Sequence, residues 1–384
     1  MSWKQTHIGE FVASGQIHIQ TGPFGTQLRA SDYTSEGTPV INVRNIGYGN
    51  LRPDKLEYIP DSVVDRLKIH VLERNDIVFG RKGAVDRHLL VSDEQAGWVQ
   101  GSDCIRLRIL SGPIDPMFLS FVLRLDSHKL WMLNQCSNKA TMASLNQDVI
   151  NRIPICIPDE TTQKSITFIL KRFDDLIENN RRRTQLLEEA ARLLYREWFV
   201  HLRFPGHEHV AIKDGVPEGW ERKTLGDVAP LNYGKALKQD DRVSGPFPVY
   251  GSSGIVGTHV KALVPGPTII VGRKGNVGSV YWSSEDCHPI DTVYYIDSSR
   301  CSFHLYYALQ HMSFINTDVA VPGLNRNLAH SRSILIPEQK IYRLFEDTVA
   351  PMHLQIDLLC KENVALEQGR DLLLPRLMNG EIAV

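Results

Sequence analysis

The chain has 384 residues, more than one compact core usually holds, so we expect two to three domains. Hydrophobic residues make up 42% and charged residues 23% of the sequence, an ordinary composition for folded domains that excludes a disordered or fibrous protein. The formal net charge of −1 gives no support for nucleic-acid binding by the molecule as a whole, so any DNA contact has to come from local basic patches.

Targeting and redox signals are weak. The start, Met-Ser-Trp-Lys-Gln-Thr-His, lacks the pattern of a signal peptide, and no run of about eighteen apolar residues occurs, so we expect a cytoplasmic protein without membrane contact. The six cysteines form no Cys-x-x-Cys pair, which favours free thiols over a zinc site or a disulfide framework.

The first segment, 1–160, carries short strand signals at 38–43 and 76–79 and is expected to form a strand-rich α+β domain. Two of its loops have groups suited to DNA. The loop 22–27 contains Gln27, whose amide can read base edges. The tetrad Gly-Arg-Lys-Gly at 80–83 places Arg81 and Lys82 between glycines, where they can approach phosphates closely, although a charged surface turn is the alternative interpretation.

Residues 161–200 have the most regular apolar pattern in the chain. Steps of four and three connect its apolar positions, and such a seven-residue repeat is typical of a coiled-coil interface. The seam consists of Ile166, Leu170, Phe173, Ile177, Asn180, Thr184, Leu187, Ala191, Leu194 and Trp198. A helix over about 162–199 extends for roughly 55 Å, farther than a compact domain of this size, and therefore needs a partner helix.

Residues 201–219 are rich in Pro and Gly and are expected to be a linker that ends this helix. His207 and His209 lie in this linker. Without nearby cysteines or a helical His spacing we interpret them as solvated side chains, and we expect no metal site.

The rest of the chain repeats the first half. Residues 145–149 return as 324–328 and residues 153–158 as 332–337, both displaced by 179 positions. The tetrad returns as Gly-Arg-Lys-Gly at 272–275, displaced by 192, so the first copy is expected to contain insertions. A second strand-rich domain is expected over 220–338, with strands at 247–250, 268–271 and 280–282.

The last segment, 339–384, repeats the helix seam in register. Its positions are Phe345, Val349, Met352, Ile356, Leu359, Asn363, Leu366, Arg370, Leu373 and Leu377. A duplicated domain-plus-helix unit closes with pseudo-two-fold symmetry, which makes the two helices antiparallel. We therefore predict an α+β protein with two strand-rich globular domains separated by two long antiparallel coiled-coil helices. The alternative is two ordinary amphipathic helices, each packed on its own domain.

The repeat also defines the candidate DNA-binding residues. The second copy supplies Gly-containing loops and a tetrad with side chains able to contact bases or phosphates, and a Leu-Asn pair recurs in both copies. The candidates are Gln27, Arg81, Lys82 and Asn146 in the first copy and Lys235, Lys238, Arg273, Lys274, Asn276 and Asn325 in the second.

Several motifs in this order resemble the specificity (S) subunits of type I restriction-modification systems, over essentially the whole chain. Gly-Val-Pro-Glu-Gly-Trp-Glu at 215–221 with Leu-Gly-Asp-Val at 225–228 resembles the entry to the second target-recognition domain of that family. Residues 187–200 resemble its central helix, 336–339 its domain exit and 373–382 its C-terminal helix end. Asp-Glu-Thr-Thr-Gln at 159–163 departs from the compact Glu-Gln exit and leaves the start of the first helix uncertain by a turn.

The resemblance implies that each globular half reads one half of a split DNA target and that the helices set the gap. It also implies two modification (methyltransferase) subunits on the helices, with restriction subunits joining them. S-adenosylmethionine, Mg and ATP are then bound by these partner subunits and no cofactor by this chain. Because the loops of the two halves differ, the target is expected to be asymmetric.

Catalytic alternatives find little support in the residues. A methyltransferase that modifies adenine needs an Asn-Pro-Pro-Tyr-like tetrapeptide, which is missing. Glu338 and Lys340 match part of a nuclease motif but lie at a predicted helix start. A coiled-coil scaffold without DNA affinity is the other alternative, and it agrees with the neutral overall charge.

Overall fold

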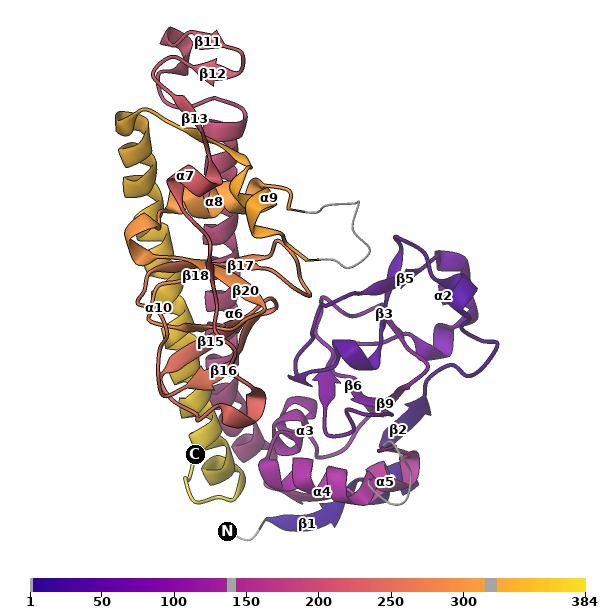
Figure 1. The fold of residues 1–384 in the computed structure, drawn as a ribbon. Coiled ribbons are helices and arrows are strands. Elements are labelled where there is room, and N and C mark those ends of the chain that lie inside the picture. Colours follow the sequence, from indigo (N-terminus) through magenta and orange to yellow (C-terminus); the bar gives the residue numbers. More distant parts are fainter. Residues whose placement is uncertain (1–2, 137–142, 315–322) are drawn as a thin grey trace. The chain divides into compact units, whose positions relative to one another are not determined.

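The computed structural model describes residues 3–136, 143–314 and 323–384 (Figure 1). It divides into two compact units, one of residues 1–177 and 365–384 and the other of residues 178–364. No helix of the described part is both long and apolar enough to cross a membrane.

The first unit contains a five-stranded sheet in the order β2-β9-β6-β7-β4 and a three-stranded sheet in the order β5-β3-β8, while β1 pairs with β10. The strands are β1 (Lys4–His7), β2 (Ile17–Thr21), β3 (Thr38–Ile41), β4 (Tyr48–Gly49), β5 (Glu57–Ile59), β6 (Ile77–Gly80), β7 (His88–Leu90), β8 (Val99–Gln100), β9 (Cys104–Ile109) and β10 (Pro154–Ile157). The helices are α1 (Ile8–Ala13), α2 (Asp61–Arg66), α3 (Pro116–Leu123), α4 (Asp126–Cys136) and α5 (Gln147–Asn151), with 3-10 turns at Ala30–Asp32, Val43–Asn45 and Lys68–His70.

The second unit contains a four-stranded sheet in the order β14-β20-β17-β18 and a three-stranded sheet in the order β16-β15-β19, and β13 pairs with β21. The strands are β13 (Glu221–Thr224), β14 (Asn232–Tyr233), β15 (Phe247–Gly251), β16 (Gly254–His259), β17 (Thr268–Gly272), β18 (Val280–Ser283), β19 (His288–Pro289), β20 (Val293–Ile296) and β21 (Ser333–Ile336). The helices are α7 (Leu225–Val228), α8 (Phe303–His311) and α9 (Arg326–His330), with 3-10 turns at Gln239–Asp241 and Ser298–Arg300.

The two units share one topology, as the sequence repeat predicts. The order β2-β9-β6-β7 of the first unit matches β14-β20-β17-β18 of the second. In each small sheet the central strand, β3 or β15, has one antiparallel and one parallel neighbour. Strand β4 and helices α2 and α4 have no counterpart among the described residues of the second unit, in agreement with insertions in the first copy.

Two long helices, α6 (Glu160–Tyr195) and α10 (Gln339–Met378), contribute to both units, and a π-helical turn follows α6 at Arg196–Val200. In the first unit Asp174 of α6 bonds Arg370 of α10, with 2.8 Å between Oδ1 and a guanidinium nitrogen. In the second unit the amide of Asn180 donates to Glu362 at 3.1 Å, and the rings of Trp198 and Phe345 lie 5.9 Å apart. Residue numbers rise along α6 as they fall along α10, so the helices are antiparallel, and the alternative of separate amphipathic helices is wrong.

The apolar seam faces the protein interior. All sixteen apolar residues of the two seams are buried or half-buried: Ile166, Leu170, Phe173, Ile177, Leu187, Ala191, Leu194, Trp198, Phe345, Val349, Met352, Ile356, Leu359, Leu366, Leu373 and Leu377. In the first unit the seam joins the core beneath the large sheet through Ile166 and Leu170. In the second unit Phe345 and Val349 do the same. The helices are therefore integral to both cores.

Element boundaries differ slightly from those expected. Helix α6 begins at Glu160 because the carboxylate of Asp159 accepts the backbone N–H of Thr162 at 3.0 Å, as an N-cap does. The expected linker, 201–219, contains the short strands β11 (Ile212–Lys213) and β12 (Val216–Pro217) and a 3-10 turn at His207–His209. Its Phe204 is buried 4.6 Å from the ring of Trp220, so the start of this segment is anchored in the second core.

Candidate nucleic-acid interface

The two Gly-Arg-Lys-Gly tetrads occupy equivalent places at the ends of central strands. They connect the antiparallel neighbours β6 and β7 in the first unit, and β17 and β18 in the second. In the first copy Arg81 donates its N–H to the carbonyl of Asp103 at 2.7 Å, and its own carbonyl accepts from Leu145 at 2.8 Å. In the second copy Arg273 makes the same two bonds, to Thr292 at 2.9 Å and from Leu324 at 2.8 Å. Both tetrads therefore begin connections between antiparallel strands.

The glycines of the tetrads are needed for the shape of these loops. Gly83 and Gly275 have φ of +76° and +80°, a left-handed conformation that glycine adopts without strain. A Cβ atom on Gly272 would lie 2.1 Å from the carbonyl oxygen of Asn276, and one on Gly80 would lie 2.9 Å from that of Ala84. Part of the recurrence of the motif therefore comes from the framework.

In both units the arginine of the tetrad lies over an exposed aromatic ring. The guanidinium of Arg81 is 4.9 Å from the ring centre of Phe24, and that of Arg273 is 4.9 Å from the ring centre of Tyr233. Phe24 is 51% and Tyr233 49% exposed. An aromatic face attracts a guanidinium and limits its freedom while its N–H edge stays available to an anion.

The second unit adds another arginine. The guanidinium of Arg326 is 5.0 Å from the same Tyr233 ring. Tyr233 also packs edge to face against Tyr294, whose hydroxyl donates to the carbonyl of Leu324 at 2.9 Å. Burial raises the pKa of the Tyr294 phenol, so this donor stays protonated. We name Arg81 with Lys82 the first basic cluster, and Arg273 with Lys274 and Arg326 the second basic cluster.

The remaining candidates have mixed roles. Asn146 and Asn325 cap α5 and α9, because their side-chain oxygens accept the N–H groups of Val149 at 2.9 Å and Asn327 at 2.8 Å. Their recurrence thus has a structural cause, although both side chains are exposed next to the tetrads. Asn276 is exposed in the second tetrad loop, where its amide lies 3.3 Å from Ser253 Oγ.

Gln27, Lys235 and Lys238 are exposed on the loops that follow β2 and β14. The side-chain oxygen of Gln27 accepts the N–H of Phe24 at 3.2 Å, so Gln27 supports the loop that carries the aromatic ring. Lys235 is held by a backbone bond from its N–H to the carbonyl of Pro289 at 3.0 Å. The backbones of these loops are fixed, while the two lysine side chains extend into solvent.

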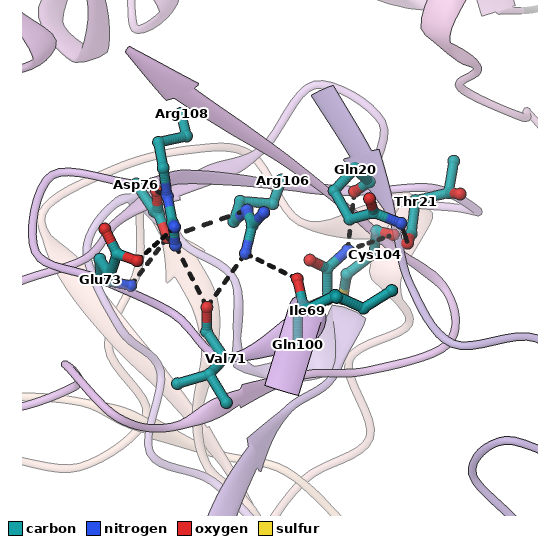
Figure 2. Close-up of polar contacts among 10 residues, drawn as sticks. All are labelled: Gln20, Thr21, Ile69, Val71, Glu73, Asp76, Gln100, Cys104, Arg106 and Arg108. Carbon is teal, nitrogen blue, oxygen red and sulfur yellow. Dashed lines mark hydrogen bonds and ion pairs between the residues drawn. The ribbon is translucent and has the colours of Figure 1, made fainter. Parts of the chain in front are cut away.

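A charged network around the buried Asp76 and Arg106 lies in the same sheet as the first tetrad (Figure 2). Arg108 of β9 donates to both carboxylate oxygens of Asp76 at 2.7 Å and also pairs with Glu73. Arg106 donates to the carbonyls of Ile69 and Val71 at 3.1 and 3.0 Å. The network joins the beginning of β6 to β9, whose neighbouring ends carry the tetrad and Asp103.

Gln100 extends these contacts, because its amide donates to the carbonyls of Gln20 and Cys104 at 2.9 and 3.3 Å (Figure 2). It thereby ties β2, which leads to the Phe24 loop, to β9. Sequence reasoning missed the aromatic rings and this network. The signal for the rings was an aromatic residue close to the candidate residues of each copy, Phe24 near Gln27 and Tyr233 near Lys235.

Other chemistry finds no assembled site. Within residues 3–136, 143–314 and 323–384 no group of three or more His, Cys, Asp or Glu side chains is placed to hold a metal ion. Glu338 lies directly before α10 and its carbonyl accepts the N–H of Tyr342 at 2.9 Å, a helix-start position.

Comparison with known proteins assigns the family. A family model described as the type I restriction modification DNA specificity domain matches residues 7–189 and 217–342. The chain is 25% identical over 292 residues to the type I restriction enzyme MjaIX specificity subunit of Methanocaldococcus jannaschii, covering 66% of either protein. It is 23% identical over 401 residues to the HindI specificity subunit of Haemophilus influenzae, covering 81% of this chain and 87% of that one.

The fold agrees with this assignment. The crystal structure of a type I restriction-modification S subunit from M. genitalium superimposes with a TM-score of 0.60 at 17% identity, covering 98% of this chain and 96% of that one. The family model alone covers well over half of the chain and matches both copies of the repeat. The chain therefore belongs to the family of type I restriction-modification specificity subunits.

Proposed function

We propose that this chain reads a bipartite, asymmetric target in double-stranded DNA, one half-site for each unit. The observation that carries the proposal is the duplicated cluster at the strand ends, where each unit presents an arginine on an exposed aromatic ring beside a lysine. Each unit docks in the major groove, where all base pairs are distinguishable, with the clusters on the phosphates.

The loops around the clusters support an asymmetric target. The first unit presents Gln27 and the second presents Lys235 and Lys238 on otherwise equivalent loops. A glutamine amide suits adenine, whereas lysine suits the acceptors of guanine. Two half-sites of different sequence follow from this difference.

The helices provide a surface for partner subunits. On α6 the side chains of Leu186 and Leu193 are 57% and 42% exposed, and on α10 those of Leu354 and Leu358 are 62% and 55% exposed. Leucines of this kind at helical spacing favour packing against further helices. We assign these faces to two modification subunits, which bring S-adenosylmethionine, and we expect restriction subunits that use Mg and ATP to join them.

Co-purification with a methyltransferase subunit, followed by sequencing of modified bases on random-sequence DNA, tests the function. We expect one copy of this chain with two partner copies and methylation at a split, asymmetric site. A chain that binds neither a methyltransferase subunit nor DNA in a salt-dependent way would contradict the proposal and favour a coiled-coil scaffold.

We further propose that the helix pair sets the spacer between the half-sites. Because Asn180 pairs with Glu362, four residues inserted after Asn180 should be matched by four after Glu362 to keep both helices paired. The insertion lengthens the pair by roughly 6 Å, and we expect a spacer longer by about two base pairs with both half-sites unchanged. Modified-base sequencing measures the spacer. An unchanged spacer would contradict the proposal that the helix pair sets its length.

A further inference from the structure

The two basic clusters are equivalent in backbone but differ in charge. At the position where the tetrad arginine bonds a backbone carbonyl, the first unit has Asp103 and the second has Thr292. In the first unit Lys82 Nζ lies 3.1 Å from the Asp103 carboxylate. The second unit has no carboxylate at this position to neutralise Lys274.

The same asymmetry continues at the neighbouring helix. Asn146 and Asn325 cap equivalent helices, and the residues that follow them are Gln147 in the first unit and Arg326 in the second. The next residues are Asp148 and Asn327. The neutral Gln147 of the first unit thus corresponds to the cation Arg326 of the second, and the acid Asp148 corresponds to the neutral Asn327.

Among the described residues around each tetrad, the first unit has three cations, Arg81, Lys82 and Arg87, and three acids, Asp86, Asp103 and Asp148. The described part of the second unit has three cations there, Arg273, Lys274 and Arg326, and one exposed acid, Asp291, whose backbone carbonyl accepts from Arg273 at 3.3 Å. Charges separated by less than a Debye length, about 8–10 Å, act together on a phosphate.

We propose that the second unit is the electrostatic anchor on DNA, with the second basic cluster binding backbone phosphates, and that Asp103 attenuates the equivalent site of the first unit. This inference rests on the proposed function. The first unit then contributes sequence reading with weak backbone affinity, and the residue at position 103 or 292 sets how strongly each unit holds DNA.

Tyr233 is a positioning residue in this arrangement, because it places two guanidinium groups on one rigid ring. Two arginines held on one ring lose rotational freedom before DNA binds, which lowers the entropic cost of contacting phosphates. In the first unit Phe24 supports one arginine.

Reciprocal swaps in the full chain test the proposal, since each introduces a residue that the fold already holds at the equivalent place. Thr292→Asp should weaken binding to a non-specific duplex several-fold and reduce the slope of log affinity against log salt by about one unit. Asp103→Thr should strengthen binding and increase that slope by a similar amount.

Matched controls separate local from global charge. Ser284→Asp adds the same charge in the exposed turn after β18, at the end of the hairpin away from the tetrad. Asp93→Thr removes an exposed acid that, like Asp103, pairs with a cation, here Arg74 at 3.3 Å. Both controls should bind like the unmodified chain.

The outcomes distinguish the two levels of the proposal. If the two swap variants bind DNA like their controls, the second unit is not the electrostatic anchor. Equal losses of DNA affinity in Arg81→Ala and Arg273→Ala would overturn it as well. In both cases DNA binding by the chain would still stand. If the unmodified chain shows no salt-dependent affinity, the proposed function fails instead. Thermal unfolding of each variant confirms that the fold is retained.

Discussion

Replacing Asp76 by alanine is expected to destabilise the first unit by about 3–5 kcal/mol, because it leaves buried arginine charge without its partner. The Asp76 side chain is fully buried and bonds Arg108 through both oxygens, and Arg106 approaches it at 4.0 Å. Hydrogen exchange measured on peptides from β6 and β9 reports this unit separately from the second, where protection should be unchanged.

The matched control is Asp93→Ala, which breaks the exposed pair between Asp93 and Arg74. Exposed pairs contribute about 0–1 kcal/mol, so this variant should unfold like the unmodified chain. A cost below about 1 kcal/mol for Asp76→Ala would mean that water reaches the network and that it does not hold β6 against β9. The strand pairing in the first unit would then have to come from other contacts than this network.

This network shows a limit of reading the sequence alone. The run Cys-Ile-Arg-Leu-Arg-Ile at 104–109 alternates polar and apolar residues and predicts a strand with two exposed arginines. Arg106 is instead buried, because the loop before β6 covers that face of the sheet and offers its carbonyls and Asp76. Local alternation cannot reveal a cover that comes from about 30 residues upstream.

The long helices were predictable because the pattern that defines them lies within each helix. Their seam depends on a seven-residue pattern within each helix, and a repeat of 179 residues pairs one seam with the other. The start of α6 was less certain, although Asp159 three residues before Thr162 is a capping signal in the sequence itself.

The candidate site was predicted in part. The tetrads were found because they occur in both copies of the repeat. Asn146 and Asn325 also occur in both copies, but they serve as helix caps. Recurrence identifies framework and function alike. Phe24 and Tyr233 both lie under the arginine of a tetrad, but they escaped notice because Phe24 is in the loop after β2 whereas Tyr233 is the last residue of β14, and their residue types differ.

The second unit is expected to lose stability as the pH falls from about 6.5 towards 4. Burial lowers the pKa of His304 to about 4 and that of His353 to about 4. Between these values and the ordinary pKa of 6.5 the unfolded chain binds more protons than the folded one, so the stability present at neutral pH decreases on acidification. At pH 5 the loss is about 2 kcal/mol for each histidine.

His304 offers the sharper test, because its ring lies 4.7 Å from that of Phe199 and its Nε2 atom has no hydrogen-bond partner among the described residues. His304→Phe should keep stability near pH 8 and recover about 2 kcal/mol at pH 5 relative to the unmodified chain. His353→Phe removes the same titration but also loses the bond to the Tyr307 hydroxyl at 2.8 Å, so it should be weaker at pH 8.

Denaturant unfolding from pH 8 to pH 5 measures these differences, with His209→Gln in the exposed 3-10 turn as the control. Glu346 changes stability in the opposite direction on acidification, because burial raises the pKa of its carboxyl and the folded state binds more protons there than the unfolded state. Its contribution is common to all variants and cancels when each is compared with the unmodified chain at the same pH. If His304→Phe has the pH profile of the unmodified chain, the acid sensitivity does not originate in this aromatic core.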